Sequence, residues 1–339
     1  MTERQGLAQS EVADGTSVKI VQIGAADAAV SDRDPDLAGR KRRICDRLDP
    51  QILRSVTNRR QHSKLQNAVA STITEGSVDR SGGAGLLQLF SLAGRAALIT
   101  GASRGIGFAI AEALGRAGAR LILNARSAAE LESAAAKLRD AGIRVDVSVF
   151  DVREAAQVQE AVTRIESSIA PLEIVVNAAG IQRRAPLERF SDADWRELMA
   201  TNLDGVYHVS KAVAPHMIGR GHGKIIHIGS VQCELARPTI APYTAAKGAI
   251  KNLTKGMCAD WARYGLQINA IAPGYFATPL NQALIDDPAF DAWLRQRTPA
   301  GRWGRLEDLH GIAVFLASSA SDFVNGQTIY VDGGIVSVI

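Results

Sequence analysis

Cysteine is scarce in this chain of 339 residues, and the three that occur, Cys45, Cys233 and Cys258, stand far apart. No CxxC pair joins them, and no cluster of histidines lies beside them. The pattern therefore indicates neither a disulfide framework nor a zinc site. We expect three free thiols and no metal centre.

Long apolar runs are also missing. No stretch approaches the roughly 18 to 20 residues that a membrane-spanning helix needs. The first 30 residues carry Glu3, Glu11, Asp14 and Asp27 where a signal peptide would have a basic start and an apolar stretch. The composition, 46% hydrophobic and 22% charged, still provides enough apolar material for a sizeable core. These features predict a cytoplasmic protein that does not enter a membrane.

A strong net charge is absent as well. The formal charge of +4 is too small to argue for nucleic acid as a partner. Within it, residues 1–36 hold seven acids and three bases, giving −4, and residues 40–64 hold nine bases and two acids, giving +7. Such a basic patch can bind an acidic surface. Residues 1–88 show no sustained period of 2 or 3.6, so we expect a poorly ordered leader, or a start codon assigned too far upstream.

From Gly94 onward the chain alternates short apolar runs with helical stretches. Such alternation predicts parallel strands joined by crossover helices. The seven candidate strands are residues 96–100, 120–124, 145–150, 173–177, 224–228, 267–271 and 327–331. We therefore predict one α/β domain over residues 89–339, a Rossmann-type, doubly wound sheet of seven parallel strands with helices on both faces. Ligands bind such sheets beyond the carboxyl ends of the strands.

The first predicted strand runs directly into a glycine-rich turn, Gly101-Ala102-Ser103-Arg104-Gly105-Ile106-Gly107, and then into a good helix former. Glycines let the chain turn tightly and let a pyrophosphate approach the free N–H groups at the start of a helix. Elsewhere, the same glycines would indicate only a turn. After the first strand of this fold they predict a dinucleotide site.

The end of the second strand indicates which dinucleotide binds. NAD-dependent enzymes usually place Asp or Glu there to accept hydrogen bonds from the ribose 2′-hydroxyl. This chain has Asn124-Ala125-Arg126, and Arg126 can bind a 2′-phosphate, with Arg104 as a second candidate. NADP(H) is therefore favoured, and NAD(H) stays possible. Asp151, just after the third strand, is a candidate adenine contact or a surface acid.

A second constellation predicts acid–base chemistry. Ser230 follows the fifth strand, and thirteen residues later Tyr243 and Lys247 stand at positions i and i+4, on one face of a helix. An ammonium beside a phenol is expected to lower the pKa of the phenol toward neutrality. Such a tyrosine can give a proton to a carbonyl or take one from an alcohol. Ser230 would bind the same oxygen, and Asn202 could hold a water that links Lys247 to solvent.

Together these motifs resemble the short-chain dehydrogenase/reductase family. The matches are the turn at residues 100–107, Asn177-Ala178-Ala179-Gly180, Asn202, Ser230, Tyr243 with Lys247, and Pro273-Gly274. The resemblance implies hydride transfer at a nicotinamide, a Ser-Tyr-Lys-Asn tetrad and usually a homotetramer. It also implies a cofactor lining that includes Val152, Asn177, Ala178, Gly180, Pro273, Gly274, Phe276 and Thr278. Ala178 replaces the second asparagine of the usual Asn-Asn-Ala-Gly, which removes an amide contact but no catalytic group.

Longer blocks resemble the branch of the family that interconverts D-gluconate and 5-dehydro-D-gluconate. They span residues 180–186, 237–243, 256–262, 272–278 and 298–305. The resemblance implies NADP(H)-linked interconversion of a sugar-acid or polyol alcohol and its ketone. A 3-oxoacyl carrier-protein reductase has the same tetrad and is the alternative. A nucleotide-sensing regulator is more remote, since a sensor has no need of the complete tetrad.

The predicted substrate residues follow the strands near the expected nicotinamide. Arg183 and Arg184 come after the fourth strand, and an arginine fork suits the carboxylate of a small sugar acid. Gln182, Gln232 and Glu234 are candidate partners for hydroxyl groups, and Tyr275 is a further candidate contact. Each of them could instead lie at the rim or at a subunit interface.

Overall fold

The computed structural model describes residues 85–339. The chain divides into the units Met1–Val78 and Asp79–Ile339, and the described residues belong to the second. The predicted leader therefore lies outside the described residues, except for its last four positions. Regular packing begins near Leu92, which is fully buried and whose N–H donates to the Ala117 carbonyl at 2.9 Å.

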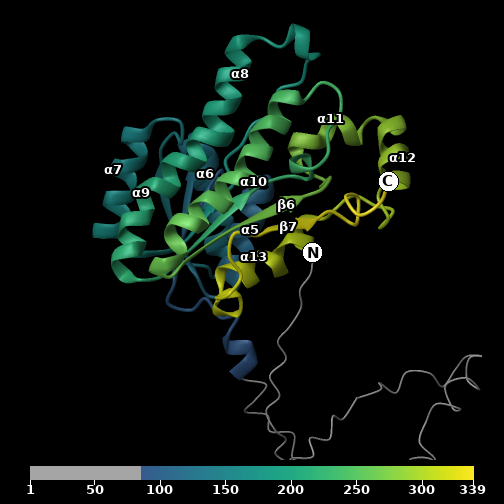
Figure 1. The fold of residues 1–339 in the computed structure, drawn as a ribbon. Helices are drawn as coiled ribbons and strands as arrows, with labels where there is room; N and C mark the ends of the chain where they lie inside the picture. Colours follow the sequence, from purple (N-terminus) through teal and green to yellow (C-terminus); the bar gives the residue numbers. More distant parts are fainter. Residues whose placement is uncertain (1–84) are drawn as a thin grey trace, which may run out of the picture. The chain divides into compact units, whose positions relative to one another are not determined.

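The predicted seven-stranded parallel sheet is confirmed (Figure 1). Its strands are β1 (Ala96–Thr100), β2 (Arg120–Ala125), β3 (Val145–Val149), β4 (Leu172–Asn177), β5 (Gly223–Ile228), β6 (Leu266–Pro273) and β7 (Thr328–Val331). Their spatial order is β3-β2-β1-β4-β5-β6-β7. The strands β1 and β5, on either side of the central β4, are buried along their whole length, as expected for strands covered on both faces.

Helices cover both faces of the sheet (Figure 1). On one face lie α5 (Gly105–Arg116), α6 (Ala128–Asp140) and α13 (His310–Ala317), whose apolar residues share a core with β1 and β2. On the other face lie α7 (Ala155–Ser168), α9 (Gly205–Arg220) and α10 (Ala241–Trp261). The two cores fix the sheet rigidly and leave its carboxyl edge for a site.

The strand order reverses between β1 and β4, and this reversal opens a crevice at the carboxyl edge. The Thr100 hydroxyl lies at the end of β1 and accepts hydrogen bonds from the N–H groups of Ala178 (3.1 Å) and Ala179 (3.2 Å). The chain after β4 is thereby held against the start of the glycine turn. Gly101, at φ 63°, accommodates this approach, because a Cβ there would lie 2.7 Å from the Ala179 Cα.

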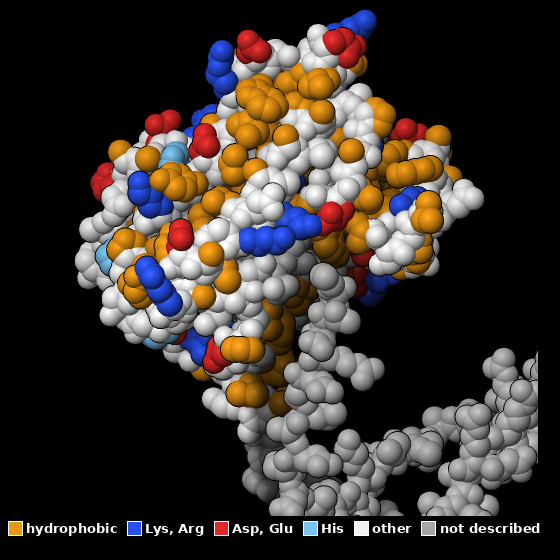
Figure 2. Space-filling view, viewed as in Figure 1, with side chains coloured by type: hydrophobic (Ala, Val, Ile, Leu, Met, Phe, Trp, Pro, Cys, Tyr) orange, Lys and Arg blue, Asp and Glu red, His pale blue; other side chains and the backbone are white. Residues whose placement is uncertain are grey.

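The segment after β6 forms a small helical layer beside this edge. It contains α11 (Gln282–Ile285) and α12 (Pro288–Arg297), and the α12 rings Phe290 and Trp293 cluster with those of Tyr275 and Trp303. Hydrophobic side chains gather over α11 and α12 in Figure 2. The Trp293 side chain of α12 is 45% exposed. Among the helices of residues 85–339, none combines the length and hydropathy needed to cross a bilayer.

Candidate active site

A cavity of about 1010 Å³ opens at the carboxyl edge of the sheet and brings most of the predicted site residues together. The predicted cofactor residues that line it are Gly101, Ser103, Arg104, Gly105, Ile106, Gly107, Arg126, Asp151, Val152, Ala178, Gly180, Tyr243, Lys247, Pro273, Gly274, Phe276 and Thr278. Ser230 and the predicted substrate residues Gln182, Arg184, Gln232 and Tyr275 line it too. Asn177, Arg183, Asn202 and Glu234 do not.

The glycine turn wraps closely around the start of α5. A Cβ on Gly107 would lie 2.3 Å from the Gly101 carbonyl oxygen, so no larger residue fits without moving backbone. Helix α5 begins at Gly105, and its first N–H groups therefore face the cavity without partners from a preceding turn. The geometry is that of an anion-binding helix start.

Two arginines stand near the end of β2, and their surroundings differ. The Arg104 guanidinium lies 3.4 Å from Glu130, in an exposed ion pair. Arg126 is exposed and forms no ion pair within residues 85–339. Asn124 does not compete for a ligand, because its side-chain amide donates to the Ser148 and Phe150 carbonyls at 3.0 Å each. Arg126 is thus the cation available to a phosphate at this end of the cavity.

The predicted cofactor residues Asp151 and Asn177 lie in different places, Asp151 in the cavity wall and Asn177 outside it. Asp151 lines the cavity and forms an ion pair with Arg153 at 2.6 Å. Burial alone would raise the pKa of Asp151, but hydrogen bonds from Arg153 outweigh it and keep that pKa below its usual value. Asn177 lies behind the wall, where its amide donates to Ser210 (3.0 Å) and to His227 Nδ1 (3.2 Å). Its position predicts support of the sheet and no direct contact with a ligand.

Ser230, Tyr243 and Lys247 all line the cavity. Ser230 follows β5, Tyr243 and Lys247 lie one turn apart on α10, and the Ser230 hydroxyl is close enough to the Tyr243 phenol to affect its pKa. The Lys247 Nζ donates to the Ile228 carbonyl at 2.6 Å and lies 5.6 Å from the centre of the Tyr243 ring. The fold therefore places a phenol, a hydroxyl and an amine around one point.

The expected lowering of the Tyr243 pKa is wrong for this structure. Burial raises the pKa of Tyr243 to about 12 and outweighs the effect of the nearby Ser230 hydroxyl, which lowers that pKa. Burial also lowers the pKa of Lys247 to about 8, and its Nζ is directed to a backbone carbonyl. At neutral pH the phenol is protonated, and the site is set to donate a proton.

Asn202 lies outside the cavity and is fully buried. Its Oδ1 accepts a hydrogen bond from the Ile181 N–H at 2.8 Å, and its Nδ2 donates one to the Ile181 carbonyl at 2.9 Å. It belongs to a π-helical turn, Ala200–Asp204, between α8 (Asp192–Met199) and α9, and such turns often occur at functional sites. In the structure the side chain positions the segment after β4. The water between Asn202 and Lys247 stays a prediction.

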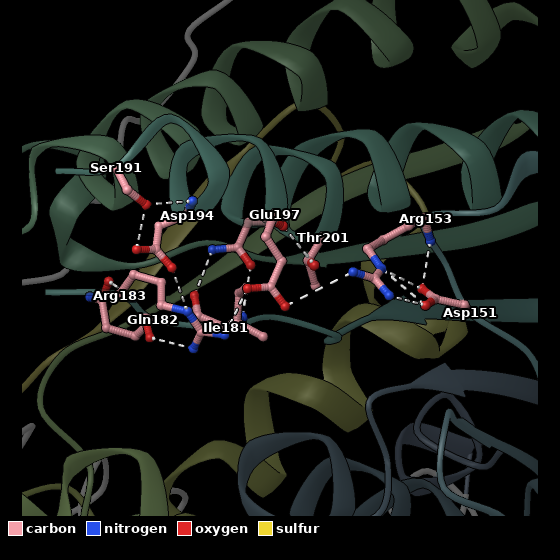
Figure 3. Close-up of polar contacts among 10 residues, drawn as sticks. Asp151, Arg153, Ile181, Gln182, Arg183, Ser191, Asp194, Glu197 and Thr201 are labelled. Atoms are coloured by element: carbon pink, nitrogen blue, oxygen red, sulfur yellow. Dashed lines mark hydrogen bonds and ion pairs between the residues drawn. The ribbon is translucent and has the colours of Figure 1, made fainter.

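The side chains of the neighbouring residues Arg183 and Arg184 have different surroundings. Arg183 does not line the cavity. It pairs with Asp194 (3.2 Å) and Glu197 (2.7 Å) of α8, as Figure 3 shows. Arg184 lines the cavity. Glu234 is also outside, bound to Lys251 and to the Tyr330 hydroxyl. Of the predicted carboxylate partners, only Arg184 is placed for the role.

Sequence reasoning missed Arg237, which is half-buried and lines the same end of the cavity. One signal was available. Arg237 lies on the loop between Ser230 and Tyr243, and a loop between two site residues must border the site. Ile181, Thr201 and Leu284 also line the cavity without having been predicted.

A buried histidine lies near Lys247. His227, on β5, is fully buried, and its Nε2 has no hydrogen-bond partner among the described residues. Burial, followed by the charge of Lys247, lowers the pKa of His227 from 6.5 to about 3. The ring is therefore neutral in the folded protein at any pH near neutrality.

This histidine predicts loss of stability in mild acid. Between pH 6.5 and about 3 the unfolded chain binds the His227 proton and the folded chain does not, so the free energy of unfolding falls as the pH drops. We expect a loss of about 1 to 2 kcal/mol by about pH 5, measured by urea unfolding. A His227→Asn variant should lose this part of the pH dependence. An equal slope in the variant would assign the acid lability to other groups.

Comparison with known proteins agrees with this geometry. The family model for enoyl-(acyl carrier protein) reductase matches residues 101–336. Gluconate 5-dehydrogenase of Gluconobacter oxydans strain 621H is 58% identical over 248 residues, which are 73% of this chain and 97% of that protein. The chain belongs to the short-chain dehydrogenase/reductase family.

Two further members of the family are similar over the same region. 5-Keto-D-gluconate 5-reductase of Escherichia coli strain K12 is 49% identical over 252 residues, 74% of this chain and 99% of that protein. A solved structure of gluconate 5-dehydrogenase from Burkholderia cenocepacia J2315, in complex with NADP and tartrate, is 59% identical, with a TM-score of 0.74. The match covers 75% of this chain and 100% of that one. The predicted family resemblance is confirmed.

Proposed function

We propose that this chain is an NADP(H)-dependent oxidoreductase that interconverts 5-dehydro-D-gluconate and D-gluconate. The observation that carries the proposal is one cavity lined by Ser230, Tyr243 and Lys247, by the glycine turn, and by an arginine without an acidic partner in the described chain, Arg184. Relatives at 58% and 49% identity, named for this reaction in its two directions, support the substrate.

The cofactor end fits a dinucleotide with a 2′-phosphate. The tight turn between Gly101 and Gly107 and the start of α5 suit a pyrophosphate, and Arg126 suits the 2′-phosphate. Asp151 and Val152 would border the adenine, and Thr278 and Pro273 the nicotinamide. The cofactor, when bound, supplies or accepts the hydride. The bound NADP of the Burkholderia relative supports NADP(H) over NAD(H).

The protein's own contribution to ketone reduction is a proton. Tyr243 donates its phenolic proton to the carbonyl oxygen, and the Ser230 hydroxyl binds the same oxygen and holds it within reach. Lys247 lies beside the ring with an ammonium that is charged below a pKa of about 8, so it offsets negative charge that develops on the phenol oxygen. In the oxidation direction the same groups take the alcohol proton.

Arg184 would bind the carboxylate of the substrate, and Gln182, Gln232 and Tyr275 its hydroxyl groups. An acyl carrier-protein substrate is not favoured, because a guanidinium at the chemical end is better suited to an acid than to an acyl chain. The decisive experiment is a spectrophotometric screen of sugar acids, polyols and 3-oxoacyl thioesters with NADPH and NADH. A faster reaction with a 3-oxoacyl thioester than with 5-dehydro-D-gluconate would refute the proposed substrate.

Cofactor choice is expected to depend on Arg126. We expect Arg126→Ala to raise the KM for NADPH by about tenfold, or about 1.5 kcal/mol for an exposed charged hydrogen bond, and to leave the KM for NADH unchanged. Arg104→Ala is the matched control, and its effect should be smaller because Glu130 already binds that guanidinium. Equal effects of Arg126→Ala on both cofactors would show that Arg126 does not touch the 2′-phosphate.

We also propose that residues 89–339 form the complete catalytic unit. Almost the whole of each relative is matched by about three quarters of this chain. Deletion of residues 1–86 should therefore leave turnover and the unfolding temperature nearly unchanged, as measured by activity assay and thermal denaturation. A deleted protein that is insoluble or inactive would assign the leader a structural role.

We propose that the protein is a cytoplasmic homotetramer. Exposed aromatic side chains on α8 and α9, Trp195 and Tyr207, are available for contacts between copies. Light scattering of the purified protein measures the assembly directly, and a monomeric mass would exclude the tetramer.

A further inference from the structure

Arg184 and Arg237 lie on different loops and both line the chemical end of the cavity. Arg184 follows β4, and Arg237 precedes α10. Within residues 85–339 neither guanidinium has an acidic partner at ion-pair distance, whereas the adjacent Arg183 has two. Two cations that share a cavity without an acid between them form a place for an anion.

The backbone holds these two loops together. The Ala185 N–H, directly after Arg184, donates to the Thr239 carbonyl at 3.1 Å, two residues after Arg237. Thr239 has a φ of 72°, a conformation that is strained for a β-branched residue. Such strain persists only where the surrounding structure enforces it, and it is concentrated at functional sites. The separation of the two arginines is therefore built into the loops.

The helical layer orients Arg237. Its guanidinium lies over the Phe290 ring of α12, 5.5 Å from the ring centre. Burial raises the pKa of Tyr275, and the nearby charge of Arg237 lowers that pKa in part. Partial burial, and after it repulsion from Arg237, lowers the pKa of Arg184. An anion between the two guanidiniums would relieve that repulsion.

A polar group that lines the same cavity as the two arginines also lacks a partner. Gln232 lines the cavity, is 6% exposed, and its Oε1 accepts no hydrogen bond from the described protein. A buried amide oxygen without a donor is costly, and a ligand hydroxyl would satisfy it. The cavity thus offers two cations for an acid group and an acceptor for an alcohol group.

We propose that Arg184 and Arg237 together clamp the carboxylate of a hydroxy acid, with Gln232 receiving one of its hydroxyls. Arg237 is then a specificity-determining residue, supported from α12 by Phe290. The proposal rests on the proposed function for the reaction itself, but it concerns a binding site that can be measured without turnover.

The test compares Arg237→Met and Arg237→Lys with Arg184→Met and the double variant. Arg237→Met should raise the KM for 5-dehydro-D-gluconate about tenfold or more and change kcat little, since it touches no reacting group. Arg237→Lys should restore part of the loss. In the double variant the loss should be smaller than the product of the single losses, because the two residues act on one carboxylate. Unchanged NADPH affinity and melting temperature show that each variant is folded.

Calorimetry of tartrate binding to the NADP-loaded enzyme provides a readout without turnover, with sulfate as the control anion. The clamp is supported if Arg184→Met and Arg237→Met each bind tartrate more weakly than the wild type, and if the wild type binds sulfate far more weakly than tartrate. An Arg237→Met enzyme with wild-type KM and wild-type tartrate affinity overturns it, as does equal binding of tartrate and sulfate. If the wild type does not reduce 5-dehydro-D-gluconate but both variants lose tartrate, the clamp stands and the proposed substrate fails.

Discussion

Replacement of Tyr243 by phenylalanine is expected to lower kcat for ketone reduction by about 10²- to 10⁴-fold, the usual contribution of a positioned proton donor. The substitution removes one oxygen from a half-buried ring and leaves α10, Lys247 and the glycine turn in place. The affinity for NADPH, measured by fluorescence titration, should therefore be close to that of the wild type. Steady-state rates with saturating substrate measure the loss.

The protonation state of Tyr243 sharpens this expectation. Because burial raises the pKa of Tyr243 to about 12, the phenol keeps its proton across the neutral range. Ketone reduction should therefore not require an acidic pH to protonate Tyr243. Ser230→Ala is the companion variant, since it removes the hydroxyl that binds the same oxygen but leaves the donor. Near-normal turnover of Tyr243→Phe would show that the proton comes from another group and would remove the proposed mechanism.

The fold was predictable because its signals are local. Each strand is a short apolar run between helical stretches, and burial on both faces requires such runs, so the seven strands were found within a few residues of their bounds. The glycine turn was equally clear, since Gly101 and Gly107 are fixed by close backbone contacts that no other residue allows. The predicted cofactor residues of the glycine turn line the cavity, whereas Asn177 at the end of β4 does not.

The rest of the site depends on side-chain direction, which the sequence does not reveal. Arg183 and Arg184 are adjacent and chemically identical, yet α8 provides two acids for the first and none for the second. Arg237 comes from a loop that the Ala185 N–H contacts by donating to the Thr239 carbonyl, a contact between segments far apart in the sequence. The pKa of Tyr243 was misjudged for a related reason, because the spacing to Lys247 is local while the burial that dominates is tertiary. Such properties follow only from packing.

The two adjacent arginines provide the sharpest test of substrate class. Arg184→Ala should lower kcat/KM for 5-dehydro-D-gluconate by about 2 to 3 kcal/mol, roughly 30- to 150-fold, because a charged hydrogen bond to the carboxylate is lost. The rate with a neutral ketose of similar length, such as D-fructose, should change little, since that substrate never made the contact. The ratio of the two kcat/KM values therefore measures the contribution of the carboxylate.

Arg183→Ala is the matched control for this variant. It removes the same side chain one position earlier, but its guanidinium pairs with Asp194 and Glu197 on the exposed side of α8, where ion pairs contribute little (Figure 3). We expect an acid-to-ketose ratio within about twofold of the wild type, since exposed pairs are typically worth under about 1 kcal/mol. If Arg184→Ala, like Arg183→Ala, leaves the acid-to-ketose ratio of kcat/KM unchanged, the carboxylate is bound elsewhere. The assignment of a sugar acid to this cavity then loses its structural basis.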